Sequence, residues 1–321
     1  MTHAPDQRQK SERHRTARTR PGPDPRQEFV DRDGGDRIGV QIYPEPTRPL
    51  GPDGSAAAHP VTPGDRAPVV VIWPAMGVRA SYYRPFAAAL RQAGLAVAVA
   101  DLRGTGASTP PPSRASGYGY AELADDVGAV QEHLKAWIDG RPSLLLGHSL
   151  GGQVALVHLA RGVGARPVDA LVLVAVGLPY WRYYRDSRRF TVLPFSQGLH
   201  AAATLLGRWP GWGFGGVQAR GVIRDWAHTA RTGRFPRIDG TDTDAAMREV
   251  RTPVLAVSVD DDQYTPHETL DRLCEKLTAA SVRREHYTAA QAGDQIDHFT
   301  WVRSSTALAE RIAAFASDLP R

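Results

Sequence analysis

Three residues of the types that nucleophilic acyl transfer uses follow one another along the chain: a serine, then an aspartate, then a histidine. Ser149 lies inside Gly147-His148-Ser149-Leu150-Gly151, after the apolar run 144–146 and before a stretch, 153–160, that favours a helix. A strand, a sharp turn and a helix in this order hold a serine hydroxyl clear of the backbone. The first N–H groups of such a helix, including that of Leu150, can stabilise an oxyanion. Ser149 is the predicted nucleophile.

A serine hydroxyl needs a base that removes its proton and an acid that orients this base. Asp262 comes just after a predicted strand at 253–259, and His298 lies in the loop after a second predicted strand at 282–287. In sites built on a serine turn of this kind, the acid and then the base follow the serine along the chain. We therefore predict that Asp262 orients His298.

Asp260 and Asp261 precede Asp262 in the same loop and are alternative acids. We expect them to shape the turn instead. Three successive aspartates could also bind a metal ion, but the sequence offers no second cluster of ligands. We expect neither a metal nor a cofactor.

Other histidines compete with His298 for the role of base. His148 sits within the serine turn, where its side chain would point away from Ser149. His158 lies on the following helix beside an apolar residue, as is typical of a packed or hydrogen-bonded core histidine. His267 starts a predicted helix close to the acid and is a weaker rival.

A second oxyanion donor is expected in the loop that follows a predicted strand at 69–73. Pro74-Ala75-Met76-Gly77 occupies this place, and the backbone N–H of Met76 is the candidate. Arg103, which follows another predicted strand, is expected to tie loops together rather than to contact a substrate.

The elements that would position these residues alternate between strand and helix from residue 69 onward. Two further strands, joined by a Gly34-Gly35 turn, precede them. This alternation predicts an α/β fold with a mostly parallel central sheet and helices on both faces. The predicted strands are 28–33, 37–43, 69–73, 95–100, 144–146, 170–176, 253–259 and 282–287; the predicted helices are 81–93, 120–137, 153–160, 266–277 and 307–315.

The pattern divides the chain into four parts. Residues 1–27 carry seven basic and three acidic side chains and are expected to be a disordered tail. Residues 28–177 and 251–321 form the two parts of the core. The insertion between them, residues 178–250, holds four of the seven tryptophans, and we predict that it is a cap over a binding cleft.

Aromatic side chains of this insertion can line an apolar pocket. We predict that Trp181, Tyr184 and Trp226 contact the substrate. The arginines Arg182 and Arg185 could contact an acidic group, although solvation is the simpler interpretation.

Composition excludes several other classes of protein. The chain has 321 residues, 42% of them hydrophobic, a net charge of +5 and the single cysteine Cys274. No apolar run approaches the roughly 20 residues of a membrane span, and no apolar leader follows the basic residues at the start. Most of the positive charge lies in the tail. We expect a cytoplasmic protein that binds neither nucleic acid nor a membrane.

The sequence resembles the α/β-hydrolase superfamily, and within it a bacterial group of predicted hydrolases that is serine aminopeptidase-like. The resemblance spans roughly residues 69–302. At two positions the chain differs from the usual pattern, since Met76 replaces a smaller or polar residue and Asp297 replaces a glycine before His298. The matching segments are 74–77, Tyr82-Tyr83-Arg84-Pro85-Phe86, 101–108, 147–152, Asp261-Asp262 with Pro266, and Asp297-His298-Phe299.

These observations together predict a serine hydrolase that cleaves an ester or related acyl bond of a small-molecule substrate through an acyl-enzyme. One alternative is a thioesterase or acyltransferase of secondary metabolism. The segment 73–90 also resembles thioesterases that serve polyketide or peptide synthases. A second alternative is a ligand-binding protein that uses the same fold without turnover.

Overall fold

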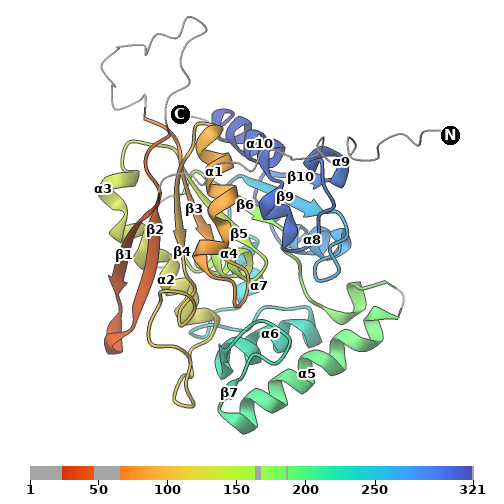
Figure 1. The fold of residues 1–321 in the computed structure, drawn as a ribbon. Helices are drawn as coiled ribbons and strands as arrows, with labels where there is room; N and C mark the ends of the chain where they lie inside the picture. Colours follow the sequence, from red (N-terminus) through yellow and green to blue (C-terminus); the bar gives the residue numbers. More distant parts are fainter. Residues whose placement is uncertain (1–23, 47–65, 163–167, 186, 320–321) are drawn as a thin grey trace, which may run out of the picture.

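The apolar runs of the sequence form one eight-stranded sheet (Figure 1). The computed structural model describes residues 24–46, 66–162, 168–185 and 187–319. The strands lie in the order β1-β2-β4-β3-β5-β6-β9-β10. Their bounds are β1 (Arg26–Asp31), β2 (Arg37–Ile42), β3 (Val69–Trp73), β4 (Ala96–Ala100), β5 (Ser143–His148), β6 (Ala170–Val174), β9 (Val254–Val259) and β10 (Val282–Tyr287).

The sheet is mostly parallel, as the strand–helix alternation predicts. Only the pairs β1–β2 and β2–β4 are antiparallel, and the pairs from β4 to β10 are parallel. Every residue of β3, β4, β5, β6 and β9 is buried. Continuous aliphatic runs of this kind suit strands that are covered on both faces.

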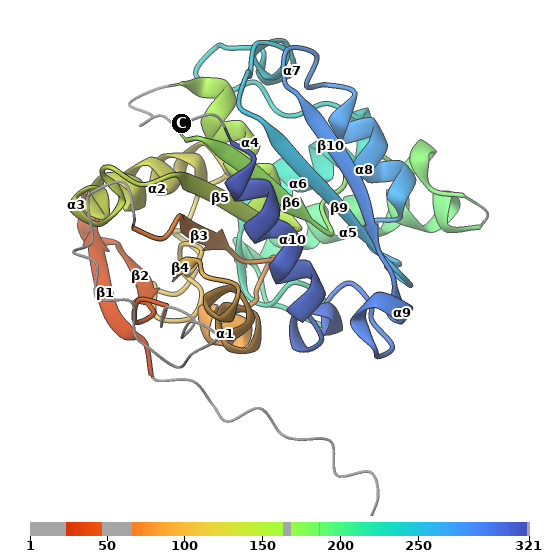
Figure 2. The same ribbon diagram turned by 90° about the horizontal axis from the view of Figure 1, so that it is seen from above.

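Helices cover both faces of the sheet (Figure 2). On one face, α1 (Arg84–Gln92) and α10 (Thr306–Ser317) pack over Val70 and Ile72 of β3. On the other face, α2 (Tyr120–His133) and α4 (Leu150–Arg161) share an apolar cluster with the alternate residues Val69 and Val71, and α8 (His267–Cys274) packs against β9. The short helices α3 (Lys135–Ile138) and α9 (Ala289–Ala292) complete the core.

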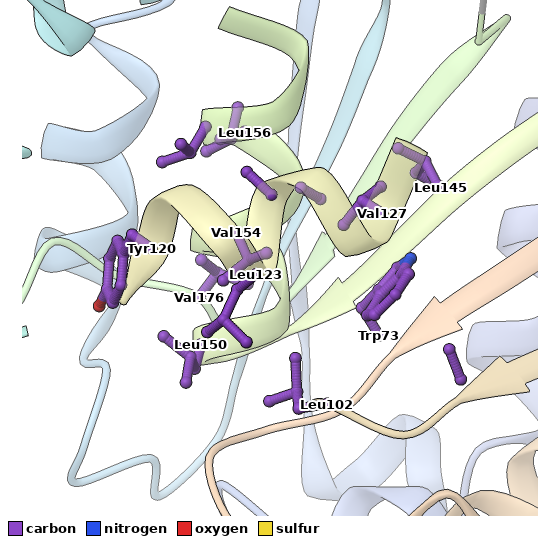
Figure 3. Close-up of a cluster of buried hydrophobic side chains, with 14 of the residues drawn as sticks. Trp73, Leu102, Tyr120, Leu123, Val127, Leu145, Leu150, Val154, Leu156 and Val176 are labelled. Atoms are coloured by element: carbon purple, nitrogen blue, oxygen red, sulfur yellow. The ribbon is translucent and has the colours of Figure 1, made fainter. Parts of the chain in front are cut away.

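The helix that follows the serine turn is held by a dense apolar cluster. Figure 3 shows Leu150 and Val154 of α4 beside Leu123 of α2, with Trp73 of β3 in the same cluster. These side chains are almost fully buried. Burial of a large apolar side chain stabilises a fold by about 1.5–3 kcal/mol, so this cluster fixes the position of the serine turn.

The observed elements differ from the predicted ones most clearly in three places, and the bounds of several others shift by one to three residues. The predicted helix 120–137 is interrupted at Leu134, whose backbone leaves helical geometry. The predicted strand 170–176 ends at Val174, because Ala175 has a φ of +51°. The first strand starts at Arg26, two residues inside the predicted tail, while residues 1–23 lie outside the described part.

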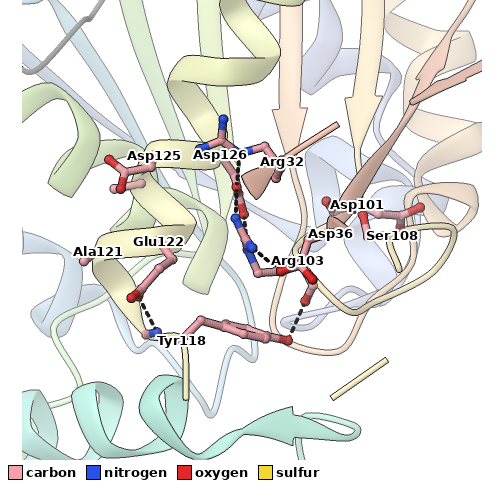
Figure 4. Close-up of polar contacts among 12 residues, drawn as sticks. Arg32, Asp36, Asp101, Arg103, Ser108, Tyr118, Ala121, Glu122, Asp125 and Asp126 are labelled. Carbon is pink, nitrogen blue, oxygen red and sulfur yellow. Dashed lines mark hydrogen bonds and ion pairs between the residues drawn. The ribbon is translucent and has the colours of Figure 1, made fainter. Parts of the chain in front are cut away.

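Arg103 lies in a buried ion-pair network that joins distant parts of the core (Figure 4). Its Nε donates to Asp126 Oδ2 over 2.9 Å, and it also pairs with Asp36. Arg32 donates to the same Asp126 over 3.0 Å. The guanidinium groups therefore connect α2 to the β1–β2 hairpin, which agrees with the structural role expected for Arg103.

The insertion, residues 178–250, folds mainly as two helices. Figure 1 shows α5 (Arg188–Leu206) and α6 (Arg220–Thr232) below the sheet, and a short hairpin, β7 (Arg208–Trp209) with β8 (Gln218–Ala219), joins them. The last helix of the insertion, α7 (Thr243–Met247), packs against α4 beside the sheet.

A buried carboxylate of α6 binds this helix to the start of α2. Asp225 is buried and accepts a hydrogen bond over 2.9 Å from the backbone N–H of Tyr120, at the start of α2. The first N–H groups of a helix have no partner within the helix, so this contact caps α2. A side-chain carbon on Gly119 would lie 2.3 Å from Asp225 Oδ2, and only glycine leaves this room.

Candidate active site

Ser149 occupies a strained turn between β5 and α4. Its φ of +53° and ψ of −119° lie outside the regions that side chains usually adopt. A side-chain carbon on Gly151 would lie 2.2 Å from the carbonyl oxygen of Trp73, so the helix could not approach β3 if this residue were larger. The Ser149 side chain does not cap α4. The turn therefore presents the hydroxyl instead of using it for structure.

Asp262 and His298 meet through a direct hydrogen bond. His298 Nδ1 lies 2.8 Å from Asp262 Oδ2, and both side chains are buried. Asp262 also accepts bonds from the backbone amides of Tyr264 and Thr265 and, over 2.6 Å, from the Thr265 hydroxyl. These bonds fix the carboxylate, and its contact with Nδ1 leaves Nε2 as the ring nitrogen available for proton transfer.

The other two aspartates of the loop have different partners. Asp260 lies 2.7 Å from His286 Nε2 and accepts the backbone amide of Ala289. Asp261 is exposed and has a φ of +53°, so it forms the bend of the turn. Asp262 is thus the one of the three that contacts His298.

The rival histidines are placed elsewhere. His158 is buried on α4, with its Nδ1 3.0 Å from the carbonyl oxygen of Ala124. Burial lowers the pKa of His158 to about 4. His267 is exposed at the start of α8. Each agrees with the position predicted from the sequence.

His148 is fully buried beneath the site and contacts Tyr83. The Tyr83 hydroxyl accepts the backbone N–H of Ala75 over 2.9 Å and lies 2.7 Å from His148 Nδ1. Because the hydroxyl oxygen already accepts from Ala75, its own proton is free to be donated to His148. Burial and the neighbouring His298 hold the pKa of His148 well below its usual value. This chain of bonds links the serine turn to the 74–77 loop.

The unusual Asp297 organises the loop that carries His298. One oxygen, Oδ1, accepts the backbone amides of Phe299 and Thr300 over 2.8 Å each and the Thr300 hydroxyl over 2.9 Å. Burial alone would raise the pKa of this carboxyl, but these donors outweigh it and lower the pKa. The aspartate that replaces the usual glycine therefore stabilises the loop, because it binds the two amides that lead into the turn at Thr300–Arg303.

A cavity of about 410 Å³ brings the predicted site residues together. Ser149 and His298 both line it, as do Met76 and Leu150, whose amides are the candidate oxyanion donors. Among the described residues, neither amide has a hydrogen-bond acceptor. Of the described residues around this cavity, none is an aspartate, glutamate, lysine or arginine.

The wall opposite the serine comes from the insertion. Tyr184 and Trp226 line the cavity, as predicted. Trp181 does not, which corrects the prediction: its ring packs on Tyr180 and lies under the Arg182 guanidinium, 4.9 Å away. Arg185 likewise lies outside the cavity and pairs with Glu268 over 2.5 Å.

Four aromatic residues that were not predicted to contact the substrate complete the cavity: Phe195, Phe214, Tyr264 and Phe299. Phe214 lies at the centre of this group, with ring centroids 5.3 Å from Phe195, 5.4 Å from Trp226 and 6.1 Å from Tyr264. The Tyr264 ring in turn lies 5.0 Å from His298. Two of these rings have positions that point to the site in the sequence: Tyr264 comes two residues after Asp262, and Phe299 directly follows His298.

A second and more polar hollow, of about 1060 Å³, lies beside the first. It includes Asp260, Asp261 and Asp297, and it shares His298 with the apolar cavity. No three ligand-type side chains in the described ranges are grouped so as to hold a metal ion. Over the same ranges, no helix has the length and apolar character to cross a bilayer.

Comparison with known proteins places the chain in a family. The protein-family model described as "Serine aminopeptidase, S33" matches residues 64–291, more than two thirds of the chain. The AB hydrolase superfamily protein YisY of Bacillus subtilis is 40% identical over 79 residues. That match covers 25% of this chain and 26% of YisY, so the chain spans only about a quarter of that relative.

Solved structures share the fold at low sequence identity. A soluble variant of monoglyceride lipase from Saccharomyces cerevisiae has a TM-score of 0.65 at 13% identity, over 93% of this chain and 97% of the lipase. The thioesterase domain from the curacin biosynthetic pathway has a TM-score of 0.54 at 17% identity, over 90% of this chain and 99% of that domain. At these identities the likeness concerns the fold alone.

Proposed function

We propose that this chain, which belongs to the serine aminopeptidase S33 family and is a hydrolase with the α/β-hydrolase fold, cleaves carboxylic esters that carry an apolar, uncharged acyl group. The observation that carries the proposal is the His298–Asp262 pair, bonded at 2.8 Å, in one cavity with the strained Ser149.

The proposed reaction proceeds in two halves. Ser149 Oγ attacks the ester carbonyl while His298 Nε2 takes its proton, and the carbonyl oxygen becomes an oxyanion held by the amides of Met76 and Leu150. The oxyanion collapses, the C–O bond to the alcohol breaks, and His298 returns the proton to that alcohol. Water then attacks the acyl-enzyme in the same way and releases the acid. Asp262 keeps the His298 ring oriented and stabilises its charged form.

The chemistry of the cavity supports an uncharged acyl group. Among the described residues that line it, there is no aspartate, glutamate, lysine or arginine. Phe195, Phe214 and Trp226 supply apolar surface. An aminopeptidase needs an acidic group to bind the ammonium of its peptide, since a charged group buried without a partner is costly. We therefore favour an ester over a peptide amino terminus, despite the description of the family.

A thioester is the second candidate, because the same residues would attack it and the chain has the fold of the curacin thioesterase domain over nearly all of that domain. Transfer of the acyl group to an acceptor other than water would use the same first half-reaction. A binding protein without turnover is the remaining alternative.

One experiment distinguishes these functions. Purified protein is assayed with p-nitrophenyl esters of increasing acyl length, acyl-CoA thioesters and amino-acid p-nitroanilides, and it is labelled with a fluorophosphonate. We expect ester hydrolysis to dominate and Ser149 to be labelled. Ser149→Ala should abolish both, because losing a triad nucleophile costs roughly 10⁶-fold in kcat. An unlabelled, inactive wild-type protein would favour the binding function.

A further inference from the structure

A loop of the insertion lies directly against the loop that carries Met76. A side-chain carbon built on Gly77 would lie 2.2 Å from the carbonyl oxygen of Gly215. One built on Gly215 would lie 2.6 Å from Met76 Sδ. Real side-chain carbons do not approach other atoms so closely. The 74–77 loop and the insertion therefore touch through their backbones at Gly77, where only glycine fits, and a side chain at Gly215 would displace the Met76 thioether.

The insertion loop, residues 210–217, is held in place by side chains of the β7–β8 hairpin. The indole Nε1 of Trp209 donates to the carbonyl oxygen of Phe214 over 2.7 Å. The amide Nε2 of Gln218 donates to the carbonyl oxygen of Gly215, also over 2.7 Å. Trp209 and Gln218 are buried and pair with each other across the β7–β8 hairpin. The Gly215 carbonyl that meets Gly77 is thus fixed by a buried donor.

This contact explains why the chain tolerates a large side chain at position 76. Met76 is only 8% exposed, and its thioether reaches toward Gly215. The space that a side chain would fill at Gly215 is the space that the Met76 sulfur occupies. A large residue on one loop is matched by the absence of a side chain on the other.

We propose that Gly215 is a positioning residue: the 210–217 loop presses on Met76 and Gly77 and so sets the direction of the Met76 N–H in the transition state. The inference rests on the proposed function, in which that N–H binds the oxyanion. The insertion then contributes to the chemical step as well as to substrate binding. An interaction made only in the transition state changes kcat and leaves KM nearly unaffected.

The test substitutes Gly215 by alanine and compares it with Gly213→Ala. Both glycines have left-handed backbones, with φ of +65° and +68°, so both variants carry the same strain. A side-chain carbon at Gly213 meets no atom within 4 Å, whereas one at Gly215 meets Met76. Removing an oxyanion donor costs 10²–10³-fold and misplacing a group by 1 Å up to about 10²-fold. We expect kcat of Gly215→Ala to fall about tenfold with KM nearly unchanged.

Two further measurements test whether a fall in kcat comes from a displaced Met76 amide. The rate of Ser149 labelling by a fluorophosphonate should fall in parallel with kcat, because the phosphoryl oxygen of the adduct occupies the oxyanion site. Adding Met76→Ala to Gly215→Ala removes the sulfur that the new carbon meets, and we expect it to restore kcat at least fivefold. The kcat of Gly213→Ala should stay at least fivefold above that of Gly215→Ala.

Several results would overturn the inference. Equal kcat for the two glycine variants, a rise in KM alone, or no rescue by Met76→Ala would each leave Gly215 as part of the cavity wall only. If Gly215→Ala does not fold, Gln218→Met is the second variant, because it removes the donor to the Gly215 carbonyl. We expect Gln218→Met to lower kcat twofold to fivefold. An unchanged kcat in this variant would contradict the inference. Ser149→Ala and the wild type, assayed alongside, separate this failure from that of the proposed function. The proposed function is refuted by retained activity in Ser149→Ala or by a wild type without ester hydrolysis, whatever the glycine variants do.

Discussion

The two walls of the cavity are built from different interactions. The wall that follows the core strands carries Ser149, Asp262 and His298 and is held by short hydrogen bonds, four of which end on the Asp262 carboxylate. The wall from the insertion carries Phe214 and Trp226, whose side chains meet their neighbours through ring contacts of about 5–6 Å. Hydrogen bonds fix direction, whereas apolar contacts fix little more than volume.

This difference separates the chemical step from the choice of substrate. Misaligned atoms on the hydrogen-bonded wall should reduce turnover for every substrate. Altered rings on the aromatic wall should change which acyl groups fit and leave the reaction itself intact. The exception that we infer is the 210–217 loop, where the aromatic wall touches the 74–77 loop. The predictions below test this division, from the largest expected effect to the smallest.

Asp262→Asn should lower kcat about 10⁴-fold, because an amide favours the wrong tautomer of His298 and does not stabilise its charged form. Asp260→Asn and Asp261→Asn are matched controls in the same loop, and neither side chain contacts His298. Steady-state kinetics on a p-nitrophenyl ester checks this. If Asp261→Asn were the most damaging of the three, the acid that orients His298 would be Asp261, and our assignment of Asp262 would be wrong by one residue.

Acid should destabilise the helix that carries the serine turn through His158. Its pKa of about 4 in the folded chain lies below the unfolded value of about 6.5. Between these values the unfolded chain binds a proton that the folded chain does not, so the stability present above pH 6.5 is lost as the pH falls toward 4. The difference corresponds to about 3 kcal/mol.

Urea unfolding at pH 7.0, 5.5 and 4.0 measures this loss, and His158→Gln, which does not titrate, is the control. We expect the free energy of unfolding of the wild type to decline relative to the variant as the pH falls. Parallel curves for the two proteins would show that His158 does not carry the effect.

Asp297→Ala should lower kcat about tenfold, because three donors to one carboxylate oxygen hold the His298 loop and small displacements of a reacting group are costly. Asp294→Ala is the control, since the Asp294 side chain accepts hydrogen bonds from the Gln295 amide and the Ser304 hydroxyl and does not bond to Phe299 or Thr300. The two variants are compared by kcat and by thermal midpoint. Equal losses of kcat would mean that the general stability of the loop, and not the hydrogen bonds of Asp297, determines the turnover rate.

Trp226→Ala should change acyl preference with a threefold to tenfold rise in KM for the acyl length that the wild type prefers, because Trp226 lines the cavity. Trp181→Ala removes an equally large ring of the insertion that lies outside it, and substrate preference should persist. The series of p-nitrophenyl esters measures both. A shift in both variants, or in neither, would break the distinction between the two walls.

The sequence predicts the hydrogen-bonded wall far better than the aromatic one. Ser149 is marked by its glycines and by the strand and helix around it, and Asp262 and His298 by their places after strands, so local pattern and chain order suffice. Trp181 was assigned wrongly because the insertion has no regular periodicity that tells which side of the chain faces inward. The Met76–Gly215 contact could not be predicted, since it joins loops far apart in the sequence.

Because Asp225 caps α2, exchange of the Tyr120 amide hydrogen reports whether α6 is docked on the core. That hydrogen is bonded to a carboxylate carried by α6, so it can exchange with solvent deuterium only when α6 withdraws. The inner helix α6 buries seven residues, whereas the longer α5 buries three, and amides in weakly packed segments exchange through smaller openings. Slow exchange at Tyr120 with rapid exchange along α5 would therefore mean that α5 opens locally while α6 stays docked on the core.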